Sequence, residues 1–130
     1  MRLHYALLPL LLLSACAPPQ PFVAQNAAGK APTEVSKLIA ASEANLFPCS
    51  FTQIAGDGAP QIGGRRNEVT IAPGRYVISL ECASSYHSFK PQADLVARPG
   101  KIYRITGYLV DNSVTIFTMR MRLKIEELSP

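Results

Sequence analysis

The sequence has no tryptophan, only two histidines and three cysteines among its 130 residues. His4 lies in an N-terminal segment that we expect to be removed, which leaves His87 as the single imidazole of the mature chain. One imidazole excludes a metal site built from several histidines of one chain. The formal net charge of +4 is mild, whereas nucleic-acid binders usually carry many clustered basic residues. We therefore expect no metal, no cofactor and no nucleic-acid partner.

The chain begins with a short apolar segment that has the features of an export signal. Arg2 supplies a positive charge, and residues 7–13 are leucine apart from one proline. A transmembrane helix needs ~20 apolar residues, so this stretch is too short to span a bilayer. Its length and charge are typical of a secretory signal peptide. We expect residues 1–15 to be that signal peptide.

Leu13-Ser14-Ala15-Cys16 follows directly and resembles the lipobox of bacterial lipoproteins. The resemblance implies cleavage before Cys16, transfer of a diacylglycerol to its sulfur, and acyl chains such as palmitate at that residue. Two or three acyl chains anchor a protein stably, since each buried CH2 contributes about 0.8 kcal/mol. Ala17 in place of Asp favours, within this family, the periplasmic face of the outer membrane over the inner membrane. The alternative is an ordinary signal cut near Ala15 or Ala17, with Cys16 incidental.

Residues 16–46 are expected to form a lipid-anchored tether. Three prolines between residues 18 and 21 exclude a helix or a central strand there, because proline lacks the backbone N–H and fixes φ. Further along, good helix formers surround apolar residues at helical spacing, namely Val35, Leu38, Ile39 and Leu46. This pattern predicts a short helix at residues 34–45, with more tether as the alternative.

Residues 47–130 have the pattern of a single all-β domain. Gly56-Asp57-Gly58, Pro73-Gly74, Pro99-Gly100 and Asp111-Asn112-Ser113 are turn signals between strand-like segments. No helical period interrupts this region, so we expect a small antiparallel β-sandwich of six or seven strands. The expected strands are residues 50–55, 68–71, 75–82, 93–97, 102–110 and 114–125.

These turns and their flanking strands, including residues 69–78 and 97–105, resemble the PEGA-like and transthyretin-like modules of bacterial envelope proteins. The resemblance implies a non-catalytic β-sandwich and transfers no catalytic residue. His87 lies in a serine-rich loop without a Gly-x-Ser-x-Gly elbow, and Asp57 is explained by its turn. We therefore predict that the protein is not an enzyme.

Cys49 and Cys82 remain once Cys16 carries lipid. An even number of thiols in an oxidising compartment predicts a disulfide between them. The enclosed loop of roughly 34 residues corresponds to ~3–4 kcal/mol of stabilisation in the chain-entropy model. The alternative is a redox or metal pair, but the sequence has neither a Cys-x-x-Cys motif nor histidines near these cysteines.

The last two expected strands form a hairpin whose faces differ in chemistry. With a loop at residues 111–113, Tyr103 faces Met121 on a core side, and Arg104 faces Arg120 on the other. Opposed arginines are unfavourable, and an apolar patch bordered by cations is unusual on a free surface. We interpret the second face as a contact surface for an acidic protein, lipid headgroups or peptidoglycan carboxylates, formed by Arg104, Tyr108, Val110, Val114, Ile116, Arg120, Arg122 and Lys124. The alternative is that a second sheet or the helix at 34–45 covers its apolar part.

Together these features predict a non-catalytic lipoprotein at the outer membrane, acting as an accessory, scaffold or adaptor module in an envelope assembly. The alternative prediction is a module that binds a small ligand or a glycan.

Overall fold

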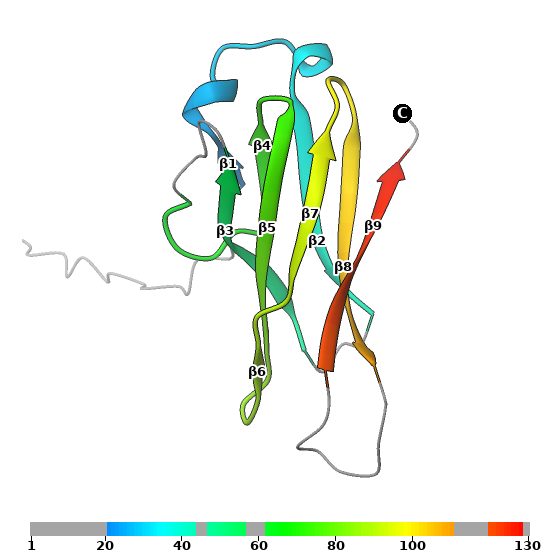
Figure 1. Ribbon diagram of the computed structural model, residues 1–130. Coiled ribbons are helices and arrows are strands. Elements are labelled where there is room, and N and C mark those ends of the chain that lie inside the picture. The colour runs from blue at the N-terminus through cyan, green and yellow to red at the C-terminus, as the bar shows by residue number, and fades with distance from the viewer. Residues whose placement is uncertain (1–20, 44–46, 57–61, 111–119, 129–130) are drawn as a thin grey trace, which may run out of the picture.

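The computed structural model describes residues 21–43, 47–56, 62–110 and 120–128. These residues form strands and two short 3-10 helices, which confirms the all-β prediction (Figure 1). Within these ranges, seven strands have four or more residues. In chain order the elements are β1 (Phe22–Val23), η1 (Gln25–Ala27), η2 (Pro32–Glu34), β2 (Ser36–Ser42), β3 (Cys49–Gly56), β4 (Glu68–Ile71), β5 (Gly74–Ala83), β6 (Ser88–Phe89), β7 (Gln92–Ala97), β8 (Ile102–Val110) and β9 (Arg120–Leu128).

The strands form two sheets. The first has the order β1-β4-β2-β8-β9, and the second joins β3 to β5, which pairs with β6 and β7 along its other side. β1 with β4 and β2 with β8 are parallel pairs, whereas the other pairs are antiparallel. The prediction of an antiparallel sandwich is therefore wrong for these two pairs. Neither pair is joined by a hairpin, so the chain can bring both strands in the same direction.

A single hydrophobic core lies between the two sheets. Alternate residues of β5 point into it, because side chains in a strand alternate between the two faces of the sheet. Tyr76, Ile78 and Leu80 are at most 4% exposed. Both sheets contribute the other large buried side chains, which are Leu38, Phe51, Ile54, Val69, Ile71, Leu95, Tyr103 and Ile105. Burying one such side chain contributes about 1.5–3 kcal/mol, so the two sheets are held together mainly by this layer.

The predicted helix at residues 34–45 is wrong, because most of this segment is β2. Leu38 is fully buried, and Ser36 Oγ donates a hydrogen bond of 2.7 Å to the Arg98 carbonyl oxygen. β2 has hydrogen-bonded neighbours on both sides, β4 and β8. Pairing on two edges and burial of alternate residues therefore outweigh the weak local preference for a helix.

The folded domain also begins earlier than the predicted boundary before residue 47. β1 pairs with β4, and Ala24 and Ala27 are buried. Asn26 Oδ1 accepts a hydrogen bond of 3.2 Å from the Ala72 backbone N–H, and the Tyr76 hydroxyl donates one of 2.7 Å to the Ala72 carbonyl. Residues from Phe22 onward are therefore part of the domain and not of a tether.

Candidate functional site

The predicted partner surface lies on the outer face of the first sheet, at its β8–β9 side. Val110 pairs with Arg120, and Ile102 pairs with Leu128. The predicted pairing of Arg104 with Arg120 is therefore wrong by six residues. A shift by an even number keeps every residue on its predicted face of the sheet.

The observed register places a carboxylate where the sequence prediction placed an arginine. Glu126 lies opposite Arg104, with 3.6 Å between the guanidinium and a carboxylate oxygen. Lys124 Nζ lies 2.8 Å from the other oxygen of Glu126. The hydrogen bond from Lys124 lowers the pKa of Glu126 and raises the pKa of Lys124. The like-charge repulsion expected in the hairpin is replaced by two ion pairs.

Two arginines at the start of β9 lie beyond this ion-pair group. Arg120 and Arg122 are exposed, and neither forms an ion pair with another residue of the described ranges. Tyr108 lies opposite Arg122, and Val110 lies opposite Arg120. Tyr108 and Val110 are half-buried. We call the surface formed by Arg104, Tyr108, Val110, Arg120, Arg122 and Lys124 the hairpin face. Val114 and Ile116 lie outside the described residues.

The hairpin face is open to solvent at its charged side chains. Sheet two packs against the opposite face of β8, where Tyr103 and Ile105 are buried, and the segment predicted as a covering helix is β2. The side chains of Arg104 and Lys124 are 48% and 64% exposed. Among the described residues, neither a second sheet nor a helix covers this face, so that alternative prediction is wrong for them.

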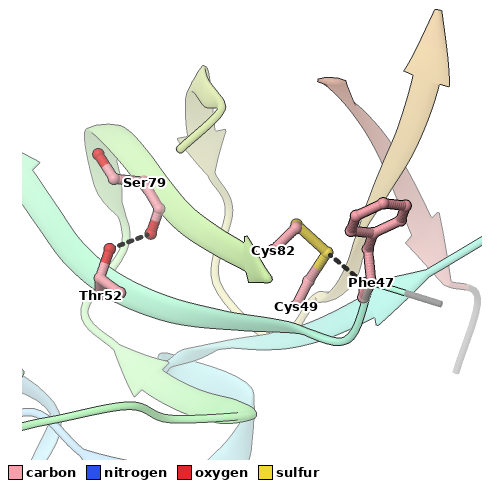
Figure 2. Close-up of a disulfide and its surroundings, with 5 residues drawn as sticks. All are labelled: Phe47, Cys49, Thr52, Ser79 and Cys82. Atoms are coloured by element: carbon pink, nitrogen blue, oxygen red, sulfur yellow. Dashed lines mark hydrogen bonds between the residues drawn. A yellow bond between two sulfur atoms is a disulfide. The ribbon is translucent and has the colours of Figure 1, made fainter. Parts of the chain in front are cut away.

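Cys49 and Cys82 form the predicted disulfide (Figure 2). They lie directly opposite each other at one end of β3 and β5, with Cα atoms 4.0 Å apart. Cys82 is fully buried, and Phe47 packs beside this end of the sheet with its ring 5.4 Å from that of Phe89. Cys16, the predicted site of lipid attachment, lies outside the described residues.

A groove of about 560 Å³ opens on the same outer face, between the 3-10 helices and the strands β4, β2 and β8. Lys30, Lys37 and Lys101 line it together with Glu68 and several apolar side chains. Lys37 Nζ lies 2.8 Å from Glu68, and Lys101 Nζ lies 3.6 Å from Glu127. The lining thus carries more positive than negative charge.

Sequence reasoning did not find this groove. Its walls come from residues 23–35, where the sequence predicts a tether and the start of a helix, and from strands far along the chain. The available signal was ambiguous, because Ser36, Leu38 and Ala40 fall on one face of a strand, whereas Val35, Leu38 and Ile39 also fit the spacing of a helix.

The one histidine of the described residues, His87, lies in a loop. His87 is exposed in the loop before β6, and its backbone N–H binds Ser84 Oγ at 3.2 Å. No group of three or more His, Cys, Asp or Glu residues in that part could hold a metal ion. Among the same residues, no helix is long and apolar enough to cross a membrane.

Comparison of the chain with protein-family models, with curated proteins and with solved structures finds no match.

Proposed function

We propose that the protein is a non-catalytic adaptor, anchored by lipid to the periplasmic face of the outer membrane, which binds an acidic envelope partner through its hairpin face. The observation that carries this proposal is the pair of exposed arginines, Arg120 and Arg122, beside Tyr108 and Val110. Arginine and tyrosine are enriched where protein interfaces bind tightly. Arginine also binds carboxylates through two parallel hydrogen bonds.

The anchor and the compartment are supported by separate features. Leu13-Ser14-Ala15-Cys16 has the lipobox pattern, and Ala17 fits sorting to the outer membrane. The Cys49–Cys82 disulfide is compatible with an oxidising compartment such as the periplasm. The resemblance to small envelope β-sandwich modules supports a binding role without catalysis.

The test is crosslinking in living cells followed by capture of the tagged full-length chain from envelopes. The interface variant R120E/R122E reverses two charges on the hairpin face. Its matched control is R75E/K90E, which makes the same change in charge at two exposed residues of the second sheet and of the loop after β6. We expect a defined partner that is lost in the first variant and retained in the second.

Two further results bear on the proposal. The variant C16S, which lacks the sulfur for lipid attachment, should leave the outer-membrane fraction and lose the partner. A partner captured equally by R120E/R122E and by wild type would contradict the proposed surface. A C16S variant that stays with the outer membrane would contradict the proposed anchor.

A second candidate function is the binding of a small anionic ligand or an acidic glycan, favoured by the lysine-lined groove. A specific ligand raises the melting temperature, because it binds the folded state and shifts the equilibrium by mass action. A thermal-shift screen of envelope glycans and small anions tests it, with K30E/K101E as the variant. A shift that disappears in this variant but persists in R120E/R122E would favour the groove over the hairpin face.

A further inference from the structure

β9 is a long edge strand. It pairs with β8 on one side, and no other strand of the described residues pairs with its second side (Figure 1). Natural edge strands are usually protected by short length, a bulge, proline, inward-pointing charges or charged side chains, lysine above all. β9 has nine residues, pairs with β8 in one unbroken register, and contains neither proline nor glycine. Its protection is limited to charged side chains, which disfavour a neighbouring strand of like charge and permit one of opposite charge.

The two faces of β9 differ in a way that defines what such a strand would carry. Arg120, Arg122 and Lys124 project on the outer face, with Glu126 as the only acid among them. The inner face carries half-buried apolar side chains that pack at the margin of the core, namely Met121, Leu123 and Ile125. A neighbouring strand would therefore meet cations on one face and apolar groups on the other.

The accessible part of the edge is its first half. Near its end, Glu127 forms an ion pair with Arg98, which follows β7 of the second sheet, and a second one of 3.6 Å with Lys101. Among the described residues, no ion pair joins Arg120, Arg122 or Lys124 to the second sheet. Among the described residues, the edge is therefore held to the second sheet by the ion pair of Glu127, and no strand or ion pair of the second sheet engages it over residues 120–124.

We infer that the free edge of β9 binds an extended segment of the partner protein as an added strand. In this segment acidic residues alternate with apolar ones. The acids face Arg120 and Arg122, and the apolar side chains cover Met121 and Leu123. Main-chain hydrogen bonds supply affinity and alternate side chains supply specificity in this mode of recognition. The inference rests on the proposed adaptor function and specifies the class of partner.

A second copy of the chain matches the charges of this edge less well than an acidic segment does. If two β9 strands paired antiparallel with Arg120 opposite Glu126, then Arg122 would lie opposite Lys124 in both halves of the interface. If Lys124 lay opposite Glu126 instead, Arg122 would lie opposite Leu128 and no carboxylate would face either arginine. Directly opposed like charges destabilise a strand pair. Three cations against one carboxylate on each outer face thus favour an acidic partner over self-association.

The test uses the purified full-length chain and three labelled nine-residue peptides. The first alternates Glu and Val, the second has the same composition with all Glu before all Val, and the third is the first with every backbone nitrogen methylated. Fluorescence anisotropy measures binding, and hydrogen exchange follows the amides of residues 120–124. We expect the first peptide to bind, the other two to bind at least tenfold more weakly, and exchange to slow only with the first.

Charge reversal supplies an independent check. R120E/R122E should weaken binding of the alternating peptide about tenfold or more, since each reversed cross-strand pair changes from favourable to unfavourable. R75E/K90E should bind it as wild type does. Equal binding of all three peptides would overturn the added strand. So would binding of vesicles with anionic lipids as tight as that of the alternating peptide, if the amide exchange of residues 120–124 did not change with the peptide. Either result would leave the adaptor function intact if the anchored chain still captures its partner from envelopes.

Discussion

Gly107 of β8 contacts Cys49 of β3 across the layer between the two sheets. A Cβ atom at residue 107 would lie 2.7 Å from Cys49 Sγ, 2.8 Å from Cys82 Sγ and 3.2 Å from the sulfur of Met121. The first two distances are shorter than a carbon and a sulfur atom can approach without displacement. The disulfide therefore fills this end of the core so closely that residue 107 has room only for a hydrogen atom.

We predict that G107A destabilises the domain by about 1–3 kcal/mol, the usual cost of adding a methyl group to a full core. Urea denaturation followed by circular dichroism measures this. G63A is the matched control, because a Cβ at Gly63 meets nothing within 4 Å. Equal stability of G107A and wild type would show that the disulfide can move away.

We predict that removal of the disulfide in C49A/C82A lowers the stability by ~3–4 kcal/mol, because the unfolded chain regains the entropy of the open loop. The two cysteines are 33 residues apart. Thermal denaturation of this variant and of wild type with and without reductant gives the value. Thiol labelling of native wild type at either position would contradict the bond.

The same variant tests the contact with Gly107. In the C49A/C82A background the sulfur atoms are absent, so we expect G107A to cost much less than in wild type. The difference between the two costs is the coupling energy of a double-mutant cycle. A cost that does not change would mean that some other group limits the space at residue 107.

Part of this fold could be predicted from the sequence because several strands alternate strongly. In β5, Tyr76, Ile78, Leu80 and Cys82 fall on one face, and Pro73-Gly74 marks where the strand begins. The faces of β8 and β9 were also assigned correctly, although their register was not. The register of this hairpin depends on the length of its loop, which the sequence does not determine. The alternation of faces excludes shifts by one residue, so the sequence leaves registers that differ by two residues equally possible.

β2 was missed for a different reason. Ala and Glu are good helix formers, and Val35, Leu38 and Ile39 match a helical face as well as a strand. What makes residues 36–42 a strand is pairing with β4 and β8, which lie far along the chain. The groove and its lysines were missed with it, because their position depends on this pairing.

We predict that a chain beginning at residue 47 does not fold, whereas one beginning at residue 21 does. The shorter chain lacks β2, so β4 and β8 lose the strand that lies between them. Circular dichroism and limited proteolysis distinguish the two. L38A in the full chain is a milder form of this test. We expect it to lower the free energy of unfolding by about 2–5 kcal/mol, the usual range for truncating a buried leucine.

We predict that acid weakens the ion pairs of β9. Hydrogen bonds from Lys124 and Arg98 lower the pKa of Glu126 and of Glu127, respectively, below the ordinary value of 4.5. A lowered pKa in the folded state gives stability that is complete above the ordinary value and is lost as the pH falls through the folded value. The side chains of Glu126 and Glu127 are 36% and 33% exposed, so solvent screens their ion pairs and the effect is small.

Urea midpoints of wild type and E126Q/E127Q at about pH 7 and pH 3 measure this effect. The variant should be less stable at neutral pH, and the difference should shrink in acid, where the wild-type carboxyls are protonated too. A difference that is the same at both pH values would point to packing and not to charge.

The position of β2 between two later strands also sets the order in which the domain can assemble. Lys37 pairs with Thr70 of β4 and with Ile102 of β8. β2 therefore cannot form both of its strand pairs until the chain has been completed through β8. Contacts between residues so distant in sequence slow folding, since the closure of long loops precedes any gain from pairing. β3 and β5 need no residue beyond Ala83 to pair and to bring Cys49 to Cys82. The β3–β5 pair and its disulfide can thus form first, whereas the five-stranded sheet needs the C-terminal part of the chain.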